Sequence, residues 1–405
     1  MKCSKTTIVK NTLLAATAAM ALASVGCTVG AVSDKGTNNP VPGAYVMFKK
    51  PDFATAGTGG PITKSADYQS VFAWNPASPG ANGQNGRFYL NPWGTLNAGD
   101  TTKTFVPQGW ERIYASAPGY DARVFFRNHQ YSSCKTFGNK NPYSNGAYPY
   151  DVSVPQTQSA SCAFENVALS PSNVDYVKDP DIIVDPRTLL DYAISEVRGP
   201  VLPNGTLTSN NDCEGKYDRC VRVSVGTPNV GVGDLSVTIP PGQPGPVTQH
   251  RYRRISGTTQ DDIIDASFVQ DGHPHLHFLN WTSIRLRQVT PACNTDATAT
   301  ACPVVPSTGG KRSFCLTDLT HFDDSPVAGV YQPNKGYNCG DQGIGSGMED
   351  VYVKSLTGQL VNAEGLHGQY WLEVEVNPPN DVTGKRPVLE SDYANNTSRV
   401  QITIP

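Results

Sequence analysis

Three histidines at alternate positions, His273, His275 and His277, form the pattern in this chain that most directly indicates chemistry. The chain of 405 residues has only 7 histidines, so this concentration is unusual. In an extended strand, side chains at i, i+2 and i+4 leave the same face with neighbours roughly 6.5–7 Å apart, and a modest twist lets three imidazoles converge on one ion. Pro274 also favours a strand, because it lacks an N–H and disfavours the helical region for the residue before it. The spacing therefore predicts a metal site on a strand.

The identity of the metal is a separate question. Neutral imidazole is the commonest metal ligand in proteins. A site with three nitrogens and open positions suits zinc, copper, iron or nickel, and intrinsic affinity favours Cu(II). The alternative is a strand that faces solvent and carries histidines without a metal.

The overall composition predicts a loop-rich, mainly β protein. The chain contains 38 Gly and 32 Pro, and long amphipathic helical patterns are few. Its length allows two or three domains, each with its own core. The net charge of −3 gives no reason to expect a nucleic acid partner.

Residues 1–26 have the features of an export signal. A basic stretch up to Lys10 is followed by an apolar stretch at 13–24, which is too short to cross a bilayer as a helix. Residues 21–23 (Ala-Leu-Ala) form a cleavage site for release of a soluble extracellular protein. Residues 24–27 (Ser-Val-Gly-Cys) instead resemble a bacterial lipoprotein box, apart from its first residue, where Leu is usual. We favour the second interpretation, which predicts an exported lipoprotein of the bacterial cell envelope whose only membrane attachment is a lipid on Cys27.

The cysteines predict a protein stabilised by disulfides. Of 10 cysteines, Cys3 would be removed with the signal and Cys27 would carry the lipid. The even number that remains indicates disulfides in an oxidising compartment. No C-x-x-C pair is present, which argues against a zinc site built from cysteines. The simplest of many connectivities pairs sequence neighbours, as Cys134–Cys162, Cys213–Cys220, Cys293–Cys302 and Cys315–Cys339.

Residues 28–170 are expected to form a β-sandwich. Short strands between turns are predicted at 45–48, 87–90, 112–117, 122–126 and 164–169. Pro-Gly-Ala-x-Val at 42–46, Gly-x-Phe-x-Leu at 86–90 and Ala-x-Gly-Tyr at 117–120 resemble the transthyretin-like regulatory sandwich that is appended to carboxypeptidases. The resemblance implies a module that binds or spaces rather than a catalytic domain.

A second domain is predicted at 187–405. Residues 171–186, which contain three prolines, are expected to link it to the first domain. Apolar residues near helical spacing predict one helix at 187–197. The rest of this domain is expected to be a disulfide-stapled, loop-rich β-sandwich.

Three further motifs follow the histidine strand. Residues 311–318 contain Lys-x-Ser-Phe-Cys-Leu-x-Asp, residues 342–352 contain Gln-Gly-x-x-x-Gly-x-x-Asp-x-Tyr, and residues 390–396 contain Glu-Ser-Asp-Tyr-x-Asn-Asn. With the histidines, over about residues 180–405, they resemble the catalytic domain of the lysyl oxidase family. The resemblance implies that His273, His275 and His277 bind Cu(II). It also implies that Lys311 and Tyr352 are cross-linked as lysine tyrosylquinone, with Asp350 as the catalytic base.

The chemistry of that family needs these residue types. Cu(II) and O2 can oxidise a nearby phenol to a quinone, and a lysine amine that desolvation keeps neutral can add to the ring. The quinone then condenses with a primary amine, and a carboxylate removes the α-proton. The expected activity is oxidative deamination of primary amines, including lysine side chains of surface proteins, to aldehydes, with O2 consumed and NH3 and H2O2 released.

Two other functions stay open at this point. One is a surface binding or scaffold protein with a metal site, and the other is a zinc hydrolase with a carboxylate base. Without the motifs, Lys311 would be interpreted as a surface residue, Tyr352 as a half-buried strand residue and Asp350 as a turn carboxylate.

The chain departs from animal members of the family. Gly272 and Met348 stand where animal members have cysteines, and residues 278–287 lack their additional histidine. Disulfide arrangement and substrate choice can therefore differ from those of animal members. The remaining candidates for contacts with the metal ligands are His250, His321 and His367.

Overall fold

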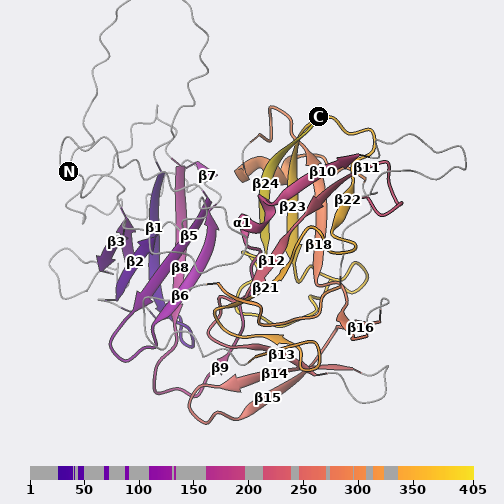
Figure 1. Ribbon diagram of the computed structural model, residues 1–405. Helices are drawn as coiled ribbons and strands as arrows, with labels where there is room; N and C mark the ends of the chain where they lie inside the picture. The colour runs from indigo at the N-terminus through magenta and orange to yellow at the C-terminus, as the bar shows by residue number, and fades with distance from the viewer. Residues whose placement is uncertain are drawn as a thin grey trace, which may run out of the picture.

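The computed structural model describes residues 26–39, 41, 44–49, 68–72, 87–90, 109–129, 132–133, 161–196, 213–238, 246–270, 274–294, 296–306, 313–322 and 336–405. These residues form many short strands and very little helix, so the predicted mainly β fold is confirmed (Figure 1). In this described part, no helix is long and apolar enough to cross a membrane. Residues 1–25 of the signal predicted at 1–26 lie outside the described residues, whereas Gly26 and Cys27 begin the first strand.

The N-terminal part is a sandwich of two four-stranded sheets. One sheet has the order β4 (Arg87–Leu90), β1 (Gly26–Asp34), β8 (Ser161–Leu169) and β7 (Ser132–Ser133). The other has the order β3 (Tyr68–Phe72), β2 (Tyr45–Lys49), β5 (Gly109–Ser116) and β6 (Arg123–His129). Val32 and Val167 from the first sheet pack against Val46 and Ile113 from the second. The predicted strands are therefore confirmed, and the transthyretin-like resemblance stays a prediction.

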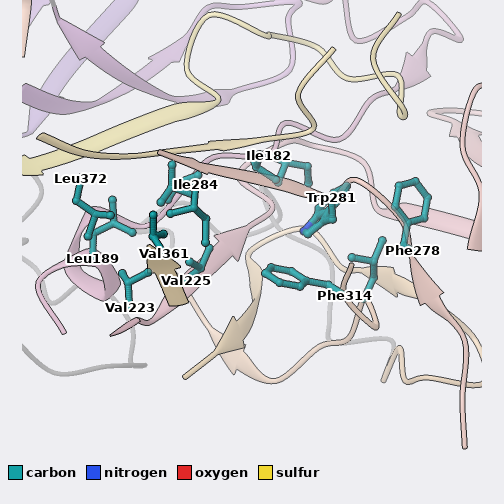
Figure 2. Close-up of a cluster of buried hydrophobic side chains, with 14 of the residues drawn as sticks. Ile182, Leu189, Val223, Val225, Phe278, Trp281, Ile284, Phe314, Val361 and Leu372 are labelled. Atoms are coloured by element: carbon teal, nitrogen blue, oxygen red, sulfur yellow. The ribbon is translucent and has the colours of Figure 1, made fainter. Parts of the chain in front are cut away.

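The C-terminal part contains several small sheets around one large apolar core. Its strands group as β10 (Tyr192–Glu196), β11 (Arg219–Val223) and β22 (Leu360–Asn362); β12 (Val225–Pro228), β21 (Met348–Tyr352) and β19 (Thr320–His321); β15 (Thr259–Ile264), β14 (Val247–Arg253), β13 (Leu235–Thr238) and β20 (Gly343–Ile344), with β9 (Val177–Lys178) beside β14; β16 (Phe268–Val269) and β17 (His277–Phe278); and β18 (Thr282–Gln288), β23 (Gly368–Val376) and β24 (Thr397–Ile404). Val223 and Val361 from the first group meet Ile284 and Leu372 from the last (Figure 2). The two groups thus share a core in the manner of a sandwich.

The helix predicted at 187–197 is wrong beyond its first turn. Asp185 accepts a hydrogen bond from the N–H of Arg187 and begins α1 (Pro186–Leu189), which ends after four residues. The chain then enters β10, where Ile194 pairs with Val221 of β11. Pairing with a strand that follows later in the sequence therefore overrides the local helical spacing.

Residues 171–186 are packed between the two parts. Ile182 belongs to the C-terminal core, whereas Ile183 packs with Phe126 and Phe322. The side-chain amide of Asn395 donates to the carbonyl oxygen of Phe126 at 3.1 Å, so the last part of the chain contacts the N-terminal sandwich directly. The N-terminal sandwich is thus held against the C-terminal part by apolar and polar contacts, and the domain division at 171–186 stays a prediction.

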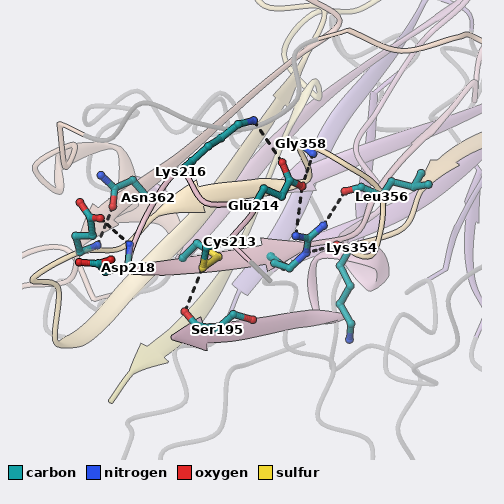
Figure 3. The surroundings of a disulfide bond; sticks show 12 residues. Ser195, Cys213, Glu214, Lys216, Asp218, Lys354, Leu356, Gly358 and Asn362 are labelled. Atoms are coloured by element: carbon teal, nitrogen blue, oxygen red, sulfur yellow. Dashed lines mark hydrogen bonds and ion pairs between the residues drawn. A yellow bond between two sulfur atoms is a disulfide. The ribbon is translucent and has the colours of Figure 1, made fainter. Parts of the chain in front are cut away.

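Three of the four predicted disulfides are confirmed in the described residues. They are Cys213–Cys220, Cys293–Cys302 and Cys315–Cys339. The predicted Cys134–Cys162 pair stays a prediction, because Cys134 lies outside the described residues. Around the first disulfide, Glu214 accepts from the N–H of Gly358 at 2.7 Å and from Arg222 at 3.4 Å (Figure 3). This disulfide therefore holds a surface turn against the loop that precedes β22.

Candidate metal and cofactor site

Two of the three predicted metal ligands lie side by side. The Nε2 atoms of His275 and His277 are 3.0 Å apart, and the ring centroids are 4.8 Å apart. His277 is 1% exposed, and His275 is half-buried. The predicted strand is confirmed only at His277–Phe278, because residues 274–275 form a bend. The two rings nevertheless meet, and His273 lies outside the described residues.

The spacing of the two nitrogens suits a shared ion. Neighbouring ligands of a tetragonal Cu(II) site stand at a right angle, so at bond lengths of about 2.0–2.1 Å, as in zinc–nitrogen bonds, their nitrogens would be about 2.9 Å apart. The observed 3.0 Å is close to that separation. The donor set therefore fits a metal that prefers imidazole.

The backbone around His277 is paired on both sides. In β17, His277 lies opposite Val269 of β16. On the other side, Phe278 and Phe314 exchange backbone hydrogen bonds, with N···O distances of 2.6 and 3.1 Å. Phe278 and Phe314 also lie near Trp281 at one end of the buried core (Figure 2). The histidine segment is therefore fixed to Phe314 in the motif at 311–318.

Tyr352 contacts two residues of the motif at 311–318. Its hydroxyl oxygen accepts a hydrogen bond from the backbone N–H of Cys315 at 2.6 Å. Its ring stacks on Phe314 with centroids 4.0 Å apart and planes inclined by 6°. Both contacts restrict the position of the phenol.

Cys315 connects the phenol to the histidines. The ligand atoms of His275, Cys315 and Cys339 all lie within 4.8 Å of one another. The backbone of Cys315 binds the hydroxyl of Tyr352, as described above. One residue therefore borders both the imidazole pair and the phenol, although it is more than 30 positions from either in sequence.

Asp350 is buried near Tyr352. It is fully buried and accepts a hydrogen bond from the hydroxyl of Thr317 at 3.2 Å. Because Asp350 and Tyr352 are two positions apart on β21, their side chains leave the same face of the strand. Lys311, the other predicted cofactor residue, lies outside the described residues, which resume at Ser313.

The same region of the sequence has a recognisable family relationship. Residues 300–404 match the lysyl oxidase family model. The range contains Cys315, Asp350 and Tyr352, whereas the histidine strand precedes it. The lysyl oxidase match supports an oxidase enzyme, and together with the disulfides it indicates an extracellular protein.

The whole chain was also compared with curated proteins and with solved structures. None of the curated proteins matches the chain. A crystal structure from Bacteroides uniformis ATCC 8492, of a protein suggested to bind carbohydrate, aligns with 94% of this chain and 100% of its own, at 7% identity and a TM-score of 0.18. A TM-score this low carries no argument about the fold.

Gln342 is a residue of the lysyl oxidase-matched region whose role the sequence did not reveal. Its amide nitrogen donates to the carbonyl oxygen of Leu276 at 2.5 Å, and its amide oxygen accepts from the N–H of Leu316 at 3.2 Å. Leu276 lies between the two histidines. Gln342 therefore joins the backbone of the histidine segment to that of the Cys315 segment. Its place at the start of the motif at 342–352 was the one sequence feature that could have indicated this role.

Asp318 positions the loop that carries Cys339. Its carboxylate accepts from the N–H groups of Gly345 at 2.7 Å, Gly336 at 3.1 Å and Tyr337 at 3.3 Å. Burial raises the pKa of this carboxyl above its ordinary value, against the effect of these N–H groups. The motif that contains Asp318 was recognised, but the partner loop was not visible in the sequence.

Glu349, the neighbour of Asp350, packs against other elements than Asp350 does. It is fully buried, and its carboxylate accepts from the hydroxyl of Thr320 at 3.3 Å. Burial and the nearby Asp185 carboxylate raise its pKa well above the ordinary value. Its carboxylate also lies against Gly226, where a Cβ would come within 2.1 Å of Oε1. Glu349 therefore belongs to the packing between α1 and β12.

The other candidate histidines have partners elsewhere. His250 contacts Asp261 at 2.7 Å and the hydroxyl of Thr238 at 2.8 Å. His367 contacts the carbonyl oxygen of Pro405 at 2.6 Å. His321 is an exposed residue of β19. These contacts give no reason to include the three residues in the metal site.

Proposed function

We propose that this chain is a copper-dependent amine oxidase of the lysyl oxidase type. It would convert a primary amine, with O2 and water, into an aldehyde, NH3 and H2O2, and a lysine side chain of a surface protein is the candidate substrate. The observation that carries the proposal is the position of Cys315, which borders His275 through its sulfur and Tyr352 through its backbone.

The roles of the residues follow from the donor set and the packing. His273, His275 and His277 would hold the copper ion, and Lys311 and Tyr352 would form lysine tyrosylquinone. When bound, copper with O2 supplies the oxidising power that converts the phenol to a quinone, and the quinone carbonyl supplies the electrophile that accepts the substrate amine.

The chain itself supplies orientation and a base. Phe314 fixes the plane of the Tyr352 ring, and the N–H of Cys315 holds the phenol oxygen. Asp350 is excluded from water on the same face of β21 and would take the proton from the carbon next to the substrate nitrogen. A proton acceptor in a site without water acts with little reorganisation.

Mass mapping after copper loading tests this proposal. The metal-free protein is loaded with Cu(II) in air, digested and searched for a peptide that links Lys311 to Tyr352. We expect the linked peptide to form only with copper and to react with phenylhydrazine. Tyr352→Phe is the control that removes the phenol. Bound copper without a link or adduct would leave a metal-binding scaffold, and hydrolytic turnover with zinc would support a hydrolase instead.

A further inference from the structure

The Cys315–Cys339 disulfide lies at the edge of the histidine pair. Both sulfur atoms and a ring nitrogen of His275 lie within 4.8 Å of one another. The Nε2 atom of His277 is 3.0 Å from that of His275. In the described part of the chain, these three residues are the one group of histidine, cysteine and carboxylate side chains with the spacing of a metal site.

The oxidised and reduced forms of this pair offer different ligands. A disulfide sulfur carries no negative charge, whereas a thiolate is a strong ligand for soft ions. In a tetrahedral site with Zn–S about 2.3 Å and Zn–N about 2.0 Å, donor atoms are about 3.3–3.8 Å apart. Reduction lets the two sulfur atoms move apart toward that distance. The ligand atoms of His275 and the cysteines, which now lie within 4.8 Å of one another, would have to approach by about 1 Å at most.

Each cysteine is held in place without the disulfide. The backbone N–H of Cys315 binds the hydroxyl of Tyr352, and Phe314 is paired with Phe278. The turn that contains Cys339 is closed by hydrogen bonds between Asn338 and Asp341, each 3.0 Å long. Asp318 holds the same turn through the N–H groups of two preceding residues. Breaking the S–S bond would therefore leave both thiols beside His275.

We propose that Cys315 and Cys339, once reduced, form with His275 a nitrogen–sulfur site for zinc or Cu(I), which disulfide formation removes. His277 or water would be the fourth ligand. Because His275 belongs to both ligand sets, the reduced protein takes a soft ion and the oxidised protein presents only imidazoles. The site does not require the quinone, so it goes beyond the proposed oxidase activity.

The chemical steps balance with a dithiol as the reductant. A thiolate of the dithiol attacks Sγ of Cys339, which is half-buried, whereas Cys315 is 2% exposed. Cys315 leaves as a thiolate, and the second thiol of the reagent closes its own disulfide and frees Cys339. The protein gains two electrons and two protons. Zinc then binds two thiolates and one imidazole and releases the two thiol protons, with no change in the oxidation state of the metal.

Cobalt titration of the full chain tests the proposal. The metal-free protein is reduced with dithiothreitol under argon, desalted and titrated with Co²⁺, whose thiolate complexes show a charge-transfer absorption. We expect one equivalent with this absorption in the reduced chain and none in the oxidised chain. Competition with zinc gives the affinity, and reoxidation of the cobalt-loaded chain should abolish the absorption.

Matched variants decide which residues bind. Cys315→Ser with Cys339→Ser should abolish the absorption, whereas Cys293→Ser with Cys302→Ser should keep it. His275→Asn should weaken zinc binding by about tenfold or more. The proposal is overturned if the reduced chain lacks the absorption, if it survives loss of Cys315 and Cys339, or if His275→Asn binds zinc unchanged. Reoxidation of the unaltered chain tests the same claim without relying on the folding of a variant.

The outcome is separate from that of the oxidase test. The cobalt absorption and its loss on reoxidation report the thiolates. The link between Lys311 and Tyr352 reports only the quinone. A chain that forms the link without binding zinc when reduced would lose this proposal and keep the oxidase.

Discussion

Phe314 and Tyr352 stack almost face to face, with ring centroids 4.0 Å apart and planes inclined by 6°. Phe314 also pairs with Phe278 through two backbone hydrogen bonds, so the ring that supports the phenol comes from a residue fixed to the histidine segment. This relationship joins the position of the phenol to that of the imidazoles.

Phe314→Leu should impair formation of the quinone. Leucine keeps an apolar side chain but removes the flat surface, so the Tyr352 ring gains rotational freedom. The loss of an aromatic pair and of packing should cost about 1–3 kcal/mol of unfolding free energy. The yield of the Lys311–Tyr352 link after copper loading, measured by mass spectrometry, should fall severalfold. Phe268→Leu is the control, because Phe268 packs on Phe278 at 5.3 Å and does not support Tyr352. Equal yields in the two variants would argue against a positioning role for Phe314.

Gln342→Leu should weaken metal binding by about 10–100-fold, because groups that orient metal ligands have effects of that size. The amide of Gln342 holds the backbone at Leu276, between the two histidines. Isothermal titration with copper measures the change. Gln249→Leu is a matched control, since Gln249 is also fully buried and makes two backbone hydrogen bonds of 2.8 Å, both to Leu389. Both variants should lose about 1–3 kcal/mol of stability. The prediction fails if copper affinity falls equally in both.

Ionisation of Glu390 should make the protein less stable as the pH rises. Burial raises the pKa of this carboxyl to about 8, although Asn377, Asn396 and the N–H of Ile182 donate hydrogen bonds to it. In the unfolded chain the pKa is about 4.5, so between pH 4.5 and 8 the folded state binds more protons and unfolding becomes easier as the pH increases. The contribution is on the order of a few kcal/mol.

Chemical unfolding at several pH values, followed by fluorescence of the buried Trp281 and Trp371, measures this slope. Glu390→Gln should flatten the decrease between pH 5 and 8, because it removes the ionisable group. It should also lower stability at pH 5, because an amide nitrogen cannot accept from Ile182. Glu364→Gln, at an exposed position, should leave the slope unchanged. An unchanged slope in Glu390→Gln would refute the assignment.

Glu373 should have the opposite pH dependence. It is 1% exposed and pairs with Arg285, Arg287 and Arg399 on the neighbouring strands. Burial opposes its ionisation, but the three arginines outweigh that effect and lower its pKa. Its contribution to stability is therefore present above about pH 4.5 and is lost as the pH falls below that value.

Glu373→Gln should remove up to about 3–5 kcal/mol of unfolding free energy near neutral pH, because it leaves three partly buried arginines without the buried carboxylate that they share. Glu375→Gln should cost less, since Glu375 is more exposed and pairs with only two of the arginines in this region. The comparison is made by urea unfolding at pH 7. Equal losses in both variants would contradict the role of burial.

Local patterns in the chain were sufficient for several features. Turn residues around short segments predicted strands such as 87–90 and 122–126, and neighbouring cysteines predicted three disulfides that the structure contains. The His-x-His spacing predicted that the rings of His275 and His277 come together, although a bend and not a strand precedes His277. Each of these features depends on residues that are close in sequence, where geometry is set by the period of a strand or by the length of a loop.

The tertiary structure decided the rest, because the deciding contacts join residues far apart in the chain. Pairing with β11 converts the expected helix at 187–197 into a strand after one turn. Phe278 meets Phe314, and Tyr352 meets Cys315, only after β12, β17 and β21 have assembled. Side-chain packing and long-range backbone pairing set these contacts, and no local periodicity records them.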